Sequence, residues 1–147
     1  MKSQIHKYEG ALFVDDRGEL GCVNECDLAD ARRMYTVRNF RKGFIRAWHG
    51  QKIEGKFISV VKGALLLAAV KVDNWENPSK DLKIEKMVLS EKNPSIVFVP
   101  GGYAHGHMNL TDETIILVLS TTTMGESRHD DFRFPARYWN PWEIEER

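Results

Sequence analysis

Two distant runs of the sequence carry histidine and other hydrogen-bonding side chains within segments that otherwise have the composition of β-strands. The run 43–56 contains His49 and Lys56, and the run 100–109 contains His105. An imidazole can act as a general base near neutral pH, and an ammonium group can stabilise negative charge on an oxygen. We therefore expect the two runs to direct their polar groups into one cavity.

Short extended segments separated by turn residues make up most of the chain and would have to position these groups. The expected strands are 11–14, 20–24, 34–37, 44–48, 56–61, 64–72, 84–89, 95–99, 105–110 and 114–121. The segment 57–70 is predicted to be a hairpin turned at Gly63, because both arms are apolar or β-branched. Only the segment 26–33 has a helical pattern, with Asp27 as its N-cap.

Length and composition predict one domain and exclude several classes of partner. A chain of 147 residues buries roughly 68 to 70% of its unfolded surface. Its 21 basic residues balance 21 acidic residues, so the chain has no excess positive charge that would attract nucleic acid or a membrane surface.

The sequence also bears on the compartment in which the protein works. No secretion signal or membrane span is evident, which favours the cytoplasm. Cys22 and Cys26 lack a metal-binding or redox spacing and are interpreted as ordinary buried thiols.

Many short strands suit either an immunoglobulin-like sandwich or a barrel. Two histidine-bearing strands that share an interior favour the barrel, because a jelly roll of this kind can hold a ligand. The fold class predicted from these features is all-β, a cupin jelly-roll β-barrel.

Four motifs resemble those of the dTDP-4-dehydrorhamnose 3,5-epimerase family of cupins. They are the N-terminal strand motif at 14–19, the Arg-x-x-His-x-Gln motif ending at Gln51, the Gly-Lys segment 55–63 and the closing motif 100–106. Their order and spacing match the family over about residues 12–123.

The resemblance implies a homodimer that acts on a nucleotide-linked 4-keto-6-deoxysugar, dTDP- or GDP-linked, in surface-polysaccharide or deoxysugar biosynthesis. Such enzymes remove a proton next to the ketone and return it from the other face without a cofactor. A single domain 1–147 would then comprise an N-terminal region 1–26 that a dimer could exchange, a barrel at about 34–123 and a tail 124–147.

The resemblance also assigns roles to individual residues. His49 is the expected base, and Lys56 and Arg46 are expected to stabilise the enolate oxygen. The expected substrate-binding residues are Arg17, Glu19, Asn39, Gln51, Tyr103, His105 and His107.

One family feature is missing from this sequence. The family's catalytic acid is a Tyr on the last long strand, where an ungapped register places Leu119. Three outcomes fit that loss: epimerisation at one carbon, C3 or C5, with water, Tyr103 or another acid; a 3,4-ketoisomerase; or binding without turnover. We favour the first, and Asp130 or Asp131 is considered for the carboxylate that orients the base.

A metal-dependent cupin is a further alternative for the same residues. His49, Glu54 and His105 could form a three-ligand site. Gln51 occupies the position of the second His of the metal-binding cupin motif, so we expect no metal.

Other residues have both functional and structural interpretations. Arg38, Arg41 and Lys42 could contact a pyrophosphate or remain solvated. The aromatic residues Trp48, Trp75, Trp139 and Trp142 could stack on a base, although core or interface packing is commoner.

Overall fold

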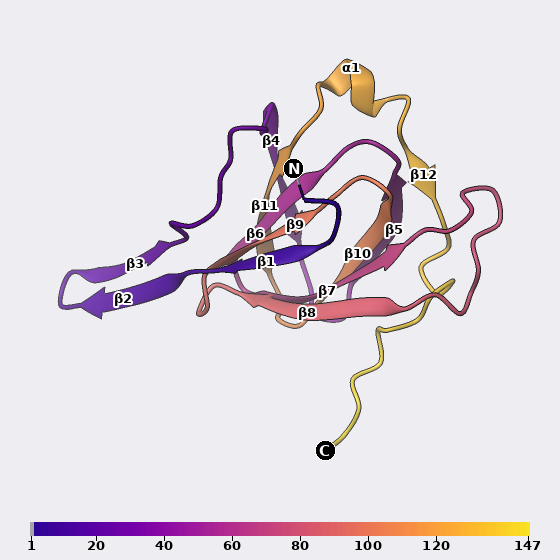
Figure 1. Cartoon of the computed structure of the whole chain (residues 1–147). Coiled ribbons are helices and arrows are strands. Elements are labelled where there is room, and N and C mark those ends of the chain that lie inside the picture. The colour runs from indigo at the N-terminus through magenta and orange to yellow at the C-terminus, as the bar shows by residue number, and fades with distance from the viewer. Residues whose placement is uncertain (1) are drawn as a thin grey trace.

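Two five-stranded antiparallel sheets face each other in the computed structural model, which describes residues 2–147 (Figure 1). The first sheet has the order β1 (His6–Glu9), β9 (Ser95–Val99), β6 (Lys56–Lys62), β11 (Thr114–Ser120) and β4 (Arg33–Asn39). The second has the order β12 (Phe132–Arg133), β5 (Ile45–Gln51), β10 (Tyr103–Asn109), β7 (Ala64–Lys71) and β8 (Ile84–Ser90). From β4 to β11 the chain passes from one sheet to the other at each step except between β7 and β8, which pair with each other, and this arrangement confirms the predicted cupin jelly roll.

The core lies between the sheets because inward and outward residues alternate along each strand. In β11, Ile116 and Val118 are buried whereas Leu117 and Leu119 are partly exposed. The inward residues join Leu67 and other apolar side chains of both sheets in one cluster. Each such side chain contributes about 1.5 to 3 kcal/mol when fully buried.

The C-terminal segment covers the outer face of the second sheet. Trp48 of β5 is fully buried there against Trp139 and Trp142, with ring centroids 5.3 and 5.2 Å away. The Trp48 indole N–H donates to the carbonyl oxygens of Ala136 and Trp139. Trp48, Trp139 and Trp142 therefore serve core packing, which was the commoner of their two interpretations. Residues 143–147, which follow them, are exposed.

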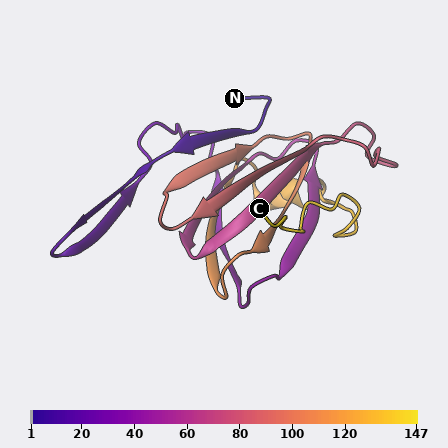
Figure 2. The ribbon, with the colours of Figure 1, turned by 90° about the horizontal axis from the view of Figure 1, so that it is seen from below.

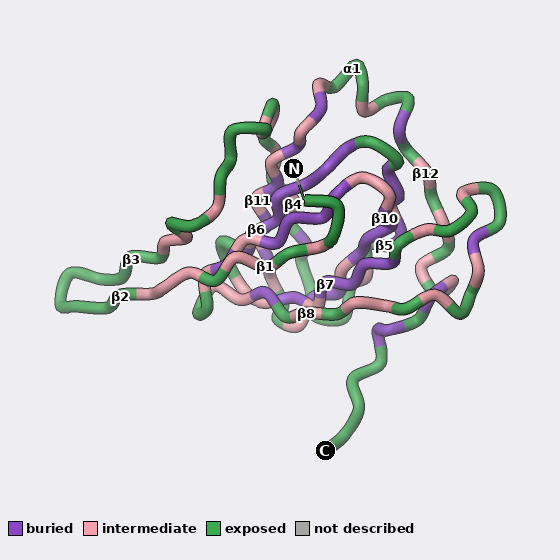
Figure 3. Tube along the Cα trace, viewed as in Figure 1, coloured by how far each residue is buried: buried purple, intermediate pink, exposed green. Residues whose placement is uncertain are grey.

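A two-stranded arm, β2 (Ala11–Asp15) and β3 (Gly18–Cys22), projects from the barrel (Figures 1 and 2). Phe13, Val14 and Leu20 on this arm are more than half exposed, and most of its tip is solvent-accessible (Figure 3). Cys22 and Cys26 are free thiols that are only partly buried, so the prediction that they are buried was too strong.

The predicted helix at 26–33 is wrong. Asp27 instead accepts a hydrogen bond from the Ala29 backbone N–H, and Ala31 donates to Leu28 in a local turn. The segment is mostly exposed and has no apolar face whose burial would stabilise a helix. The helix that does form is the short α1 (Met124–Ser127), which begins with a capping box.

The predicted hairpin at 57–70 is also wrong, although Gly63 does turn the chain with φ of 79°. Strand β6 pairs with β9 and β11, whereas β7 pairs with β10 and β8. A side chain at Gly63 would collide with the Glu113 carbonyl oxygen, so this position needs glycine for two reasons. The turn therefore carries the chain from one sheet to the other.

The remaining predicted strands are present with ends that differ by a few residues, and β1 and β12 were not predicted. Across residues 2–147, no helix has the length and apolar character needed to cross a membrane.

Candidate active site

A β-bulge in β5 turns both Arg46 and His49 toward the interior. These residues are three apart, so strict alternation would place them on opposite faces of the sheet. The pairing register with β10 shifts by one residue between His105 and His107, which leaves an extra residue on β5 and restores Arg46 to the inner face. Gly106 permits the bulge, since a Cβ there would lie 2.4 Å from that of Ala47.

Strand β10 adds two more imidazoles beside β5. His105 is the direct pairing partner of His49, and their ring centroids are 6.3 Å apart. The side-chain amide of Asn39 donates to His107 Nε2 over 2.9 Å, so His107 is neutral and protonated on Nδ1. The oxygen of the same amide accepts from Arg46 Nε at 2.6 Å, which fixes the guanidinium.

The opposite wall of the interior comes from β6, β11 and β4. Cross-strand pairing places Lys56, Ser120 and Arg33 in one row, because Ser120 pairs with both of the others. The next row in the same sheet contains Ile58, Val118 and Tyr35. Lys56 therefore faces the histidine-bearing wall from the other sheet.

These walls enclose a cavity of about 690 Å³. Its lining residues are Arg33, Tyr35, Val37, Arg46, His49, Gln51, Lys56, Ile58, His105, His107, Ile116, Val118, Met124, Ser127, Arg128, Asp131 and Arg133. Five of these side chains are cationic and one is a carboxylate, so the cavity suits an anionic ligand. The rim includes residues of α1 and β12, at the upper end of the barrel in Figure 1.

Burial and neighbouring cations keep the imidazoles neutral. Burial lowers the pKa of His49 to about 4, assisted by the positive charges of Arg133 and Lys56. The same two causes lower the pKa of His107 to about 4, with Arg46 as the nearby cation. The pKa of His105 lies well below its ordinary value because the ring is buried and lies near the positive charge of Lys56. A neutral His49 can accept a proton.

Lys56 is buried beside a fixed carboxylate. Burial lowers the pKa of its ammonium group, and the negative charge of Glu54 partly offsets that effect. Glu54 is held by Arg33 at 2.9 Å and by the hydroxyls of Ser120 and Ser127. The carboxylate thus supplies a counter-charge near Lys56 without being free to move.

Six of the residues predicted from the sequence line this cavity. They are Arg46, His49, Gln51, Lys56, His105 and His107. Asn39 lies directly behind them through its hydrogen bonds to Arg46 and His107.

The other predicted binding residues lie elsewhere. Tyr103 is 4% exposed and packs in the core cluster between the sheets, outside the cavity lining. Arg17 and Glu19 are exposed on the arm and do not reach the cavity of their own chain. Arg38, Arg41 and Lys42 are likewise exposed and do not contribute to its cationic lining.

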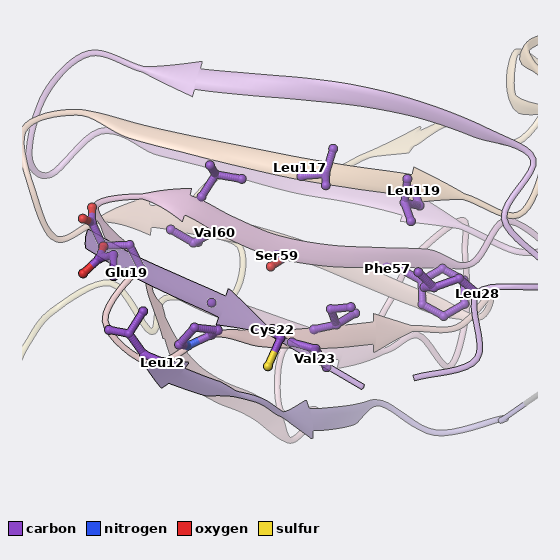
Figure 4. A pocket seen from close by; sticks show the side chains of 15 residues that line it. Leu12, Glu19, Cys22, Val23, Leu28, Phe57, Ser59, Val60, Leu117 and Leu119 are labelled. Atoms are coloured by element: carbon purple, nitrogen blue, oxygen red, sulfur yellow. The ribbon is translucent and has the colours of Figure 1, made fainter. Parts of the chain in front are cut away.

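Leu119, at which the ungapped register places the family's catalytic tyrosine, does not line the cavity. Leu119 points outward into a second, mainly apolar pocket of about 440 Å³, together with Leu117 and Phe57 (Figure 4). Val118 is the residue of this part of β11 that faces the cavity. Neighbouring positions of a strand face opposite sides of the sheet, so a side chain at position 119 is directed away from the cavity.

The two acidic residues considered for orienting the base have different positions. Both carboxylate oxygens of Asp130 accept hydrogen bonds from backbone N–H groups of the turn between β5 and β6, so this residue does not orient His49. Asp131 lines the cavity and binds Arg133, whose backbone pairs with His49.

The three-ligand metal set considered from the sequence is not assembled. Within residues 2–147, no three His, Cys, Asp or Glu side chains converge in a metal-binding arrangement. Glu54 binds Arg33 and two hydroxyls instead of approaching His49 and His105.

Among the charged and aromatic residues that line the cavity, sequence reasoning missed Arg33, Tyr35, Arg128 and Arg133. The first two were detectable in principle, because Arg33, Tyr35, Val37 and Asn39 share one face of a strand at intervals of two. Arg133 enters from the short strand β12 and Arg128 directly follows α1, two short elements that the sequence analysis did not predict.

Comparison with known proteins gives one family. Residues 11–135 match the model of the dTDP-4-dehydrorhamnose 3,5-epimerase family. A dTDP-4-dehydrorhamnose 3,5-epimerase from Methanothermobacter thermautotrophicus is 34% identical over 77 residues, which are 51% of this chain and 40% of that relative.

Solved structures show the same fold. A dTDP-4-dehydrorhamnose 3,5-epimerase from Sulfolobus tokodaii is 26% identical, with a TM-score of 0.74 over 95% of this chain and 82% of that one. The enzyme of that name from Bacillus anthracis, solved with TDP and PPi bound, has 22% identity and a TM-score of 0.76 over 97% and 86% of the two chains.

Proposed function

The chain belongs to the dTDP-4-dehydrorhamnose 3,5-epimerase family, and we propose that it epimerises a nucleotide-linked 4-keto-6-deoxysugar at one carbon, C3 or C5. The observation that carries this proposal is the approach of His49 and Lys56 to one cavity from opposite sheets. A neutral imidazole and a buried cation on facing walls are the two groups that proton abstraction beside a carbonyl requires.

His49 takes the proton from the carbon next to the ketone. The electron pair of that C–H bond forms a C=C bond, and the carbonyl π electrons move onto oxygen. Lys56 and Arg46 stabilise the resulting enolate with positive charge. Return of a proton to the opposite face of the carbon restores the ketone with inverted configuration.

The nucleotide part of the substrate supplies negative charge for the cationic lining. Arg33, Arg128 and Arg133 provide guanidinium groups that suit bidentate contact with a pyrophosphate. The Bacillus anthracis relative holds TDP and PPi, which supports a dTDP-linked substrate, with a GDP-linked sugar as the alternative.

The exposed arm supports a homodimer. At the tip of the arm, the backbone N–H, Nε and Nη2 of Arg17 donate to the carboxylate of Asp15, and the Arg17 side chain is 87% exposed. In a dimer that exchanges the arms, Arg17 and Glu19 would contact substrate bound by the other subunit.

The test is deuterium incorporation from heavy water into a panel of dTDP-, GDP-, UDP- and CDP-linked 4-keto-6-deoxysugars, followed by proton NMR. The wild-type protein is expected to exchange the proton next to the ketone and to invert that carbon in one of them. His49→Asn should abolish both, whereas His129→Asn, which changes an exposed imidazole, should abolish neither.

The same spectra separate the alternatives. Movement of the carbonyl to the neighbouring carbon would identify a ketoisomerase. Absence of exchange in all four nucleotide series would refute the proposed reaction.

A further inference from the structure

Inversion of a carbon needs a proton donor on the side of the substrate that faces away from the base. His49 belongs to the sheet that contains β5 and β10, so a sugar held in the cavity presents its other face to β6, β11 and β4. The donor for the proposed epimerisation must therefore come from the wall formed by these three strands.

Few side chains on that wall carry a transferable proton. The row that contains Lys56 also holds Ser120, which is fully buried and bonded to Glu54, and Arg33, whose guanidinium group does not lose its proton in proteins. The next rows contain Ile58 and Val118, which have no such proton. Lys56 is needed to hold the developing charge on oxygen.

Tyr35 is the remaining candidate on this wall. The sequence contains four tyrosines, at positions 8, 35, 103 and 138, and Tyr35 alone among them lines the cavity. Its pairing partner on β11 is Val118, so Tyr35 lies one strand away from the middle strand of this wall, and the Cβ atoms of the two residues are about 5 Å apart. A tyrosine side chain is long enough to cover that displacement.

The surroundings of Tyr35 suit a proton donor. The Arg33 guanidinium carbon lies 5.2 Å from the centre of the phenol ring. Burial raises the pKa of Tyr35 to about 12, with a further increase from Glu54 and an opposing effect of Arg33. The phenol therefore carries its proton at neutral pH, and Arg33 is placed to stabilise the phenolate that donation leaves.

We propose that Tyr35, acting in the reaction proposed above, is the general acid that protonates the enolate on the face opposite His49. The phenol O–H bond breaks and leaves its electron pair on oxygen. The C=C electrons of the enolate form the new C–H bond, and the electrons on the enolate oxygen restore the carbonyl. The protonated imidazole and the phenolate return to their resting states by exchange with water.

The test compares Tyr35→Phe with the wild type in heavy water, using the keto sugar that the wild type inverts. Without the acid, the enolate still forms and is deuterated again on the side of His49. We expect inversion to slow about 100- to 10,000-fold while exchange stays within about threefold of wild type, which leaves deuterated substrate of unchanged configuration. Tyr103→Phe, which removes a hydroxyl outside the cavity lining, should leave both rates unchanged.

Each result has one meaning. Inversion by Tyr35→Phe at the wild-type rate would overturn the assignment, and so would an equal loss of exchange and inversion. A wild-type protein that exchanges no keto sugar would refute the proposed function and this inference with it. Exchange that survives without inversion would establish Tyr35 as the acid.

Discussion

Replacement of Asp130 by asparagine is expected to weaken both the fold and the active site, because one buried carboxylate anchors the turn between β5 and β6. Asp130 is 6% exposed. Its Oδ1 accepts from the Lys52 N–H at 2.6 Å, and its Oδ2 accepts from those of Ile53 and Glu54 at 2.9 and 2.8 Å. The turn that it holds connects the strand of His49 to Lys56.

The expected size of the effect follows from these three bonds. In Asp130→Asn the remaining carbonyl oxygen can still accept two of them, but without the negative charge that strengthened each one. The new NH₂ group then faces the third backbone N–H, so that donor loses its partner. A lost bond to a charged group contributes roughly 1.5 to 3 kcal/mol, and with the two weakened bonds we expect a total loss of about 3 kcal/mol.

The loss is measured by urea unfolding followed by tryptophan fluorescence, with the m-value as a check that the unfolded states match. Asp131→Asn is the matched control for stability, because its ion pair with Arg133 is largely exposed and should contribute less than about 1 kcal/mol. We also expect deuterium exchange in folded Asp130→Asn to fall about 10- to 100-fold, since small displacements of reacting groups are costly.

Two results would refute this reasoning. An unfolding free energy of Asp130→Asn within about 0.5 kcal/mol of wild type would mean that the three bonds do not anchor the turn. A destabilised variant with unchanged exchange would mean that the turn does not set the positions of His49 and Lys56.

Two further predictions concern Lys56 and the buried histidines. Lys56→Met should slow exchange and inversion together by about 100- to 1,000-fold with little change in KM. NMR time courses at several substrate concentrations measure both quantities, and a rise in KM alone would contradict the role of Lys56 in stabilising the enolate. The pKa of His107 is about 4 in the folded protein and about 6.5 in the unfolded chain, so the unfolded chain binds more protons as the pH falls. His107 should therefore lower the free energy of unfolding by about 2 kcal/mol between pH 6.5 and pH 5. Urea unfolding at both pH values tests this, and a His107→Gln variant with the same pH dependence as wild type would contradict it.

The sequence was sufficient to predict the fold class and the central residues of the cavity. His49, Gln51 and His105 lie in strands with strong patterns, and their motifs keep a fixed spacing. Lys56 follows His49 closely enough that only one turn separates them. Local pattern and short-range connection therefore account for this part of the site.

The order of the strands in the sheets and the remaining residues of the site depended on which strands become neighbours. The residue pattern within one strand does not contain that information. Strands β6 and β7 look like a hairpin because they are consecutive and apolar, yet each is an interior strand of a different sheet. Tyr35 gains its position from its pairing with Val118, which is 83 residues further along the chain. Asp130 was noticed as an acid, but its role comes from backbone groups that any residue type could present.

The bulge in β5 also constrains how this strand can change during evolution. It presents Arg46 and His49 to the interior while Trp48, between them, packs against the C-terminal segment on the outside. Deletion of one residue here would bring an indole into the space meant for a sugar and expose the surface on which the tail docks. Single substitutions in this strand therefore act locally, whereas a change in its length would disturb the cavity and the docking of the tail together.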